Sequence, residues 1–140
     1  MNSATLLVNL RMSMDEKDQK KVTVTQRVSN NAVIHLDWVS LDDINEDITV
    51  KLDVKHAIQA WIENPDLNLG LQLHLEGVEV TLDDSTPELV IDTKHSNVRR
   101  KRATYMSTEF GELITSWTDC KAVERGRKCC RYISLWMNSV

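Results

Sequence analysis

The four consecutive cations Arg99, Arg100, Lys101 and Arg102 are the residues whose types and spacing suggest chemistry most directly. They form the pattern Arg-X-Lys-Arg, which furin-type proprotein convertases cut. Acidic pockets of such a protease would take Arg99 and Arg102 through ion pairs and forked hydrogen bonds. The chain as a whole has a formal net charge of -4, so the run is not part of a broadly basic body, and we expect no nucleic-acid partner.

Two other interpretations of this run stay open at this point. A solvated linker would account for its polarity without any partner, and short Lys/Arg runs also occur in nuclear-import and nucleic-acid-binding segments. Because proteolysis requires an exposed and flexible segment, the processing interpretation predicts a flexible linker over residues 94–102.

The three cysteines, Cys120, Cys129 and Cys130, all follow the basic run. They contain no C-x-x-C pair, and the nearest histidine, His95, lies far upstream, so the pattern is poor for zinc. An odd, clustered set suggests a disulfide module that is incomplete or that pairs between chains, in an oxidising compartment. The run therefore separates a cysteine-free part from a cysteine-bearing part, and this placement favours processing.

Alternating apolar and polar residues predict strands over residues 4–12, 21–28 and 32–39, each with one buried face. The side chains expected on these faces are Leu6, Val8, Leu10 and Met12; Val22, Val24 and Val28; and Ile34, Leu36 and Trp38. A further strand is expected over residues 88–92.

A second alternating series changes parity at Gly77. The odd-numbered positions are Leu69, Leu71, Leu73 and Leu75, and the even-numbered ones are Val78, Val80 and Leu82. Since a one-residue slip would send one set into water, the change predicts a bulge or a tight turn at Gly77.

Residues 53–64 have the spacing of an amphipathic helix. Its apolar stripe is Val54, Ala57, Ile58, Trp61 and Ile62. We expect Asp53 to cap the start, and Pro65 to end the helix because the residue before a proline disfavours helical geometry.

These elements predict a mainly β fold with one or two helices. No apolar run is long enough for a membrane-spanning helix, so we expect no membrane span. The scattered histidines, the absence of a nucleophile motif and the small number of glycines predict a protein that is not an enzyme and holds no cofactor or metal.

With these stretches in view, the chain resembles the precursors of the transforming growth factor β superfamily, in its myostatin- and myoglianin-like branch. The matching stretches are LDVKHAIQAWIENPDLNLGL at 52–71, RRKR at 99–102, DC at 119–120 and CCRY at 129–132. The helix followed by NLGL is characteristic of these propeptides.

The resemblance implies three parts. Residues 1–93 would be a β-sandwich propeptide arm domain that is N-terminally incomplete, and 94–102 a linker with the cleavage site. Residues 103–140 would be the truncated start of the mature factor, an incomplete cystine-knot segment. The cut would follow Arg102, leaving Ala103 as the first mature residue.

The resemblance also implies a function. The propeptide would chaperone and shield the mature growth-factor dimer of the same family until a furin-type convertase cuts, in a secreted, extracellular setting. Cys120 would pair with Cys130, and Cys129 with a cysteine beyond this chain. Activin-type receptors would be partners only of the complete factor, so this chain, which also lacks a signal peptide, is expected to be a partial precursor that cannot signal. The alternative is an intracellular β-rich protein-binding module with a basic nuclear-targeting run.

Overall fold

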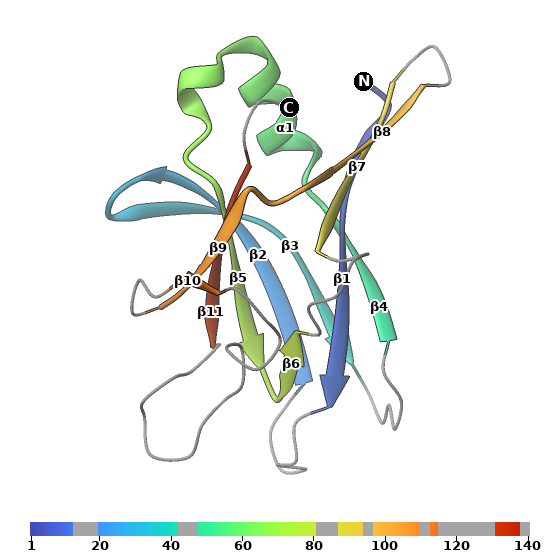
Figure 1. The fold of residues 1–140 in the computed structure, drawn as a ribbon, viewed down its shortest axis with the longest axis vertical. Coiled ribbons are helices and arrows are strands. Elements are labelled where there is room, and N and C mark those ends of the chain that lie inside the picture. The colour runs from blue at the N-terminus through green and yellow to red at the C-terminus, as the bar shows by residue number, and fades with distance from the viewer. Residues whose placement is uncertain are drawn as a thin grey trace.

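The residues that the structure describes form two antiparallel β-sheets, one α-helix and one short 3-10 helix (Figure 1). The computed structural model describes residues 1–12, 20–41, 48–80, 87–93, 97–109, 113–114 and 131–137. The predicted mainly β architecture is confirmed. Among the residues described, no helix is long and apolar enough to cross a membrane.

Sheet A contains five strands and is centred on β1. Its spatial order is β4-β1-β7-β8, and β6 pairs with β1 beside β7. The bounds are β1 Ser3–Met12, β4 Ile48–Asp53, β6 Val78–Val80, β7 Glu88–Asp92 and β8 Val98–Arg102. Leu6 lies opposite Leu89 and Leu10 opposite Val80, so β7 and β6 occupy successive stretches of one side of β1.

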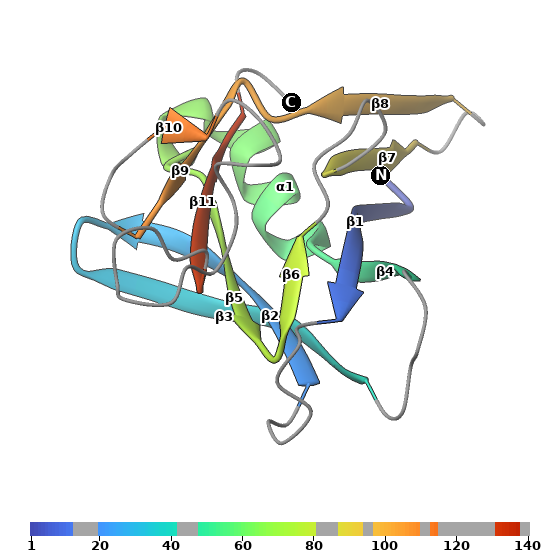
Figure 2. The ribbon, with the colours of Figure 1, turned by 60° about the horizontal axis from the view of Figure 1, so that its bottom comes forward.

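Sheet B contains six strands in the order β10-β9-β11-β5-β2-β3. The bounds are β2 Lys20–Ser29, β3 Ala32–Leu41, β5 Leu71–Glu76, β9 Tyr105–Thr108, β10 Leu113–Ile114 and β11 Tyr132–Trp136. Figure 2 shows β11 lying beside β9 and β5, although it comes last in the chain.

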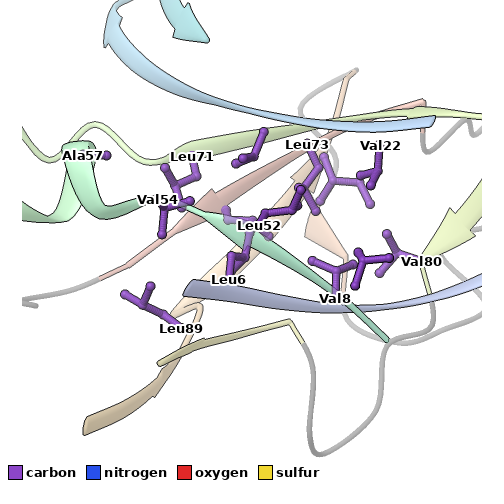
Figure 3. Packing of buried hydrophobic residues seen from close by; sticks show 14 of the residues in the cluster. Leu6, Val8, Val22, Leu52, Val54, Ala57, Leu71, Leu73, Val80 and Leu89 are labelled. Carbon is purple, nitrogen blue, oxygen red and sulfur yellow. The ribbon is translucent and has the colours of Figure 1, made fainter. Parts of the chain in front are cut away.

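The core lies between the two sheets, and it is filled by the apolar residues that alternate with polar ones along the strands. Figure 3 shows Leu6, Val8 and Leu52 from sheet A beside Val22 and Leu73 from sheet B. Each of these side chains is fully buried. Period-2 patterning therefore placed Leu6, Val8 and Leu10 of β1, Val22 and Val24 of β2, and Leu71, Leu73 and Leu75 of β5 on inner faces correctly. The predicted Leu82 and the side chain of Met12 lie outside the described part of the chain.

Helix α1, Lys55–Glu63, closes the core with Ala57, Ile58 and Trp61 buried, as predicted, and Val54 just before it is buried too. The Asp53 carboxylate accepts a hydrogen bond from the Lys55 N–H at 3.0 Å, although Asp53 stands one residue before the cap position. The helix ends before Pro65, which begins the 3-10 helix η1, Pro65–Leu67.

Two of the predicted core residues near this helix are not fully buried. Ile62 is 44% exposed, because it lies about 80° around the helix from Val54, at the margin of the apolar stripe. Leu69, between η1 and β5, is half-buried, whereas Leu71 and Leu73 are buried as predicted.

Gly77 is the point at which the chain passes from sheet B to sheet A. Its φ of 68° is readily adopted only by glycine, and it separates β5 from β6. Leu73 and Leu75 are buried before it, and Val78 and Val80 are buried after it. The predicted turn is confirmed, and the parity change accompanies a change of sheet.

The buried face predicted for β3 is wrong for Ile34 and Trp38, whereas Leu36 is partly buried against the core. Ile34 is 43% and Trp38 50% exposed, and Val28 on the neighbouring strand is 40% exposed. The register with β2 shifts between Val24 and Thr25, which leaves Leu36 as the extra residue of a bulge. Beyond the bulge Trp38 lies opposite Thr23 on the outer face, and β3 is the edge strand, so no further strand covers it among the described residues.

The flexible linker predicted over residues 94–102 is wrong for residues 98–102, which form β8. The chain after Arg102 adds β9, β10 and β11 to sheet B, where the sequence patterns had predicted no strands. Ile133 and Leu135 of β11 are fully buried, so both sides of the basic run contribute to one core.

Candidate processing site

The basic run forms the outer strand of sheet A. β8 pairs antiparallel with β7 on one side, from Val98 opposite Asp92 to Arg102 opposite Glu88, and it is last in the strand order of the sheet. Arg99, Arg100 and Arg102 are exposed. An edge strand with charged side chains is protected against pairing with other chains, which gives the run a structural role as well.

The alternation of β8 divides its cations between two faces. Arg99 and Lys101 lie opposite the buried Ile91 and Leu89, so they point to the core side of the sheet, at its rim. Arg100 and Arg102 point to the outer side. The cations therefore do not form one continuous patch.

One ion pair attaches the run to β7. The Nη1 atom of Arg100 donates to Oε1 of Glu88 at 2.6 Å, and the Arg100 side chain is 61% exposed whereas that of Glu88 is 16% exposed. An ion pair with one exposed partner contributes little to global stability, about 0–1 kcal/mol. Its local effect is to hold β8 against β7 at the middle of the run.

The peptide bond after Arg102 lies where the chain crosses between the sheets. β8 ends at Arg102, Ala103 packs partly against the core, and the Thr104 N–H donates to the carbonyl of Trp136 in β11 at 2.6 Å. Figure 1 shows β8 continuing through a short connection into β9. The bond lies between a strand of sheet A and a strand of sheet B.

This geometry suits a protease substrate in two respects and opposes it in one. The backbone of β8 is already extended, and its outer edge carries no neighbouring strand among the described residues. On the other edge, the hydrogen bonds to β7 must open before the strand can enter a protease cleft. Cleavage at this bond would therefore depend on local opening of β8 and not on a permanently flexible linker.

The remaining candidate residues are the cysteines and the histidines. The predicted disulfide residues Cys120, Cys129 and Cys130, and also His95, lie outside the described residues. His35 and His56 are exposed and far apart in the chain, and no group of three metal-ligating side chains occurs in the described ranges.

A polar and aromatic surface on the outer face of sheet B was not predicted. It includes Gln72 and His74, which alternate with the buried Leu71, Leu73 and Leu75 on β5. That alternation was the available signal, but it identifies an outer face without identifying its neighbours. The neighbours come from β11, which the sequence patterns did not place.

Comparisons with models of known protein families, with curated proteins and with solved structures find no match to this chain.

Proposed function

We propose that this chain is part of a secreted growth-factor precursor of the transforming growth factor β superfamily, of the myostatin-like branch, and that a furin-type convertase cuts it after Arg102. The observation that carries the proposal is the exposed Arg-X-Lys-Arg run on an edge strand, at a crossing between two sheets. The resemblance of residues 52–71 and 129–132 supplies the family.

In the proposed reaction, β8 first separates from β7, which breaks the ion pair between Arg100 and Glu88. The freed strand then presents Arg99 and Arg102 to the acidic pockets of the convertase, where charge-assisted hydrogen bonds hold it. Hydrolysis of the peptide bond after Arg102 leaves a carboxylate on Arg102 and an amine on Ala103.

The proposed shielding role rests on exposed apolar side chains of the part before the cut. Val28, Val33 and Ile34, near the turn between β2 and β3, are 40%, 47% and 43% exposed. Apolar surface of this kind is suited to covering apolar surface on a growth-factor dimer. The complete mature factor, with its cystine knot, would be the partner and would engage activin-type receptors.

The two products are expected to stay together after the cut. β11 pairs with β5 from Tyr132 opposite His74 to Leu135 opposite Leu71, and the Leu75 N–H donates to the Arg131 carbonyl at 2.7 Å. Because β5 and β11 lie on opposite sides of the cut in the chain, their pairing does not depend on the bond after Arg102.

The test is incubation of the intact chain with a furin-type convertase, followed by mass spectrometry under denaturing and native conditions. We expect one cut after Arg102, seen as two masses when denatured and as one complex when native. Arg102→Ala should abolish the cut. Arg100→Ala is the matched control: it removes a cation of the same run but keeps Arg99 and Arg102, so cutting should persist.

Three results would contradict the proposal. An intact run under conditions that cut a control precursor would remove the processing site. Equal cutting of wild type and Arg102→Ala would show that the protease acts elsewhere. Three reduced thiols in the secreted or native protein would instead favour the intracellular binding module, since secretion predicts oxidised cysteines.

A further inference from the structure

A shallow groove crosses the outer face of sheet B, on the side turned away from the core. Its volume is about 400 Å³, and its walls include residues of four strands, β2, β5, β9 and β11, or of the chain directly after them. The residues that matter for its chemistry are Arg27, Gln72, Ser107, Glu109, Tyr132 and Ser134. The groove lies on sheet B whereas the basic strand lies on sheet A, and ligand binding in the groove does not require the proposed processing.

The strand register places a row of short polar side chains along the groove. Ser134 lies opposite Ser107 on β9 and opposite Gln72 on β5, and Gln72 lies opposite Thr25 on β2. Residues that are directly opposite share one face of a sheet. Hydroxyl and amide groups that both donate and accept hydrogen bonds therefore line the floor.

Aromatic rings border this row on both sides. Tyr132 and Trp136 lie two residues before and two residues after Ser134 on β11, so they project from the same face. The Tyr132 ring stacks on His74 with centroids 4.4 Å apart, and the Trp136 ring stacks on Tyr105 at 5.5 Å. Tyr105 is 47% exposed, so the border formed with Trp136 is accessible to a ligand, and Tyr132 is the aromatic residue that lines the groove itself.

The charges of the groove balance. Arg27 contributes one guanidinium, whose Nη1 donates to the Asn30 carbonyl at 3.2 Å, and a guanidinium has further N–H donors. Glu109 contributes one carboxylate, and its Oε1 atom is buried without a hydrogen-bond partner in the described structure. A buried acceptor without a partner is costly, so a ligand that donates a hydrogen bond there would be favoured.

We propose that this groove binds a neutral oligosaccharide. A pyranose ring offers apolar C–H faces to aromatic side chains and a rim of hydroxyl groups that donate and accept hydrogen bonds, which matches the polar row and its aromatic borders. An extended peptide that adds to a sheet needs an unpaired strand edge, whereas the floor consists of faces of paired strands. A polyanion would meet the Glu109 carboxylate.

The test is titration of the intact chain with maltohexaose, cellohexaose and N-acetylated chitohexaose, each up to about 10 mM, by calorimetry. We expect at least one probe to bind with a Kd of about 1 mM or lower. Because the ligand is neutral, about 0.5 M salt should leave its affinity unchanged.

Two variants locate the site. Gln72→Ala and Glu109→Gln should each weaken binding about tenfold, the loss expected for one or two hydrogen bonds. The matched control is Trp38→Ala, which removes a 50% exposed aromatic side chain of the same sheet outside the groove and should bind like wild type. Thermal unfolding of each variant separates lost binding from lost folding.

Three outcomes would overturn the proposal: no binding of any of the three probes, unchanged binding by both correctly folded groove variants, or an affinity that collapses with added salt. The last outcome, together with binding of heparin, would show that the chain binds anionic glycans through its cations.

Discussion

Sheet A and sheet B differ in which parts of the sequence supply their strands. All strands of sheet A lie at or before Arg102, whereas sheet B takes β5, β2 and β3 from before that residue and β10, β9 and β11 from after it. The pairing of β5 with β11 is the boundary between the two groups, and we call it the seam. A cut after Arg102 would leave sheet A in one piece and make sheet B a joint product of two polypeptides.

The comparison teaches that the consequence of a cleavage site depends on which strands it separates. β8 is a charged edge strand that contributes no side chain to the core, and β11 is a central strand with two fully buried side chains. Three variants, ordered by expected effect, test this contrast between the seam and the edge.

The largest effect is expected at the seam from Leu135→Ala. Leu135 is fully buried and lies opposite Leu71, so truncation removes apolar contacts and leaves a cavity, at a cost of about 2–5 kcal/mol in the free energy of unfolding. Urea unfolding measures it. Val98→Ala is the matched control on β8, where the side chain is 53% exposed, and a comparable loss there would contradict the contrast.

A smaller effect, about 1–3 kcal/mol from the backbone alone, is expected from Gly70→Ala. Gly70 has a φ of 93°, and a Cβ there would lie 2.6 Å from the Leu135 carbonyl oxygen and 3.4 Å from Cε3 of Trp136. The substitution therefore strains the turn into β5 and pushes β11 away. If urea unfolding shows no loss, β11 is not held closely against this turn.

The smallest effect on stability, about 0–1 kcal/mol, is expected at the edge from Glu88→Gln, which removes the ion pair with Arg100. The effect of Glu88→Gln on the rate of cleavage should be easier to measure than its effect on stability, because the rate depends exponentially on the free energy of opening. If cleavage follows the population of opened β8, a loss of up to about 1 kcal/mol raises the convertase rate by up to about fivefold.

Asp92→Asn is the control for that rate. It removes the same charge from the same strand. Asp92 lies opposite Val98, whereas Glu88 lies opposite Arg102 and forms the ion pair with Arg100. Equal acceleration by both variants would show that net charge, and not the Arg100 pair, controls access to β8.

Local patterns predicted the parts of this fold that depend on neighbouring residues. Alternation placed Leu6 and Leu73 on inner faces, helical spacing placed Trp61, and the parity change identified the turn at Gly77. Each of these signals is contained within a few residues of sequence.

The patterns failed where pairing over long sequence distances decides the outcome. Ile133 and Leu135 are buried because β11 inserts between β5 and β9, and five residues of alternation do not specify those partners. Trp38 was assigned to the wrong face because a bulge at Leu36 changes the register within β3. The groove needs both β5 and β11, so it could not be predicted before the seam was known.

Because sheet B takes strands from both sides of Arg102, a cut there changes how its assembly depends on protein concentration. In the intact chain the seam forms within one molecule, so its formation does not depend on protein concentration. Once the bond after Arg102 is cut, the same seam joins two molecules. By mass action, the temperature at which the two pieces separate and unfold then rises with their concentration. The intact chain can therefore recover from unfolding when dilute, whereas the cut protein keeps its structure only while its two pieces stay in contact.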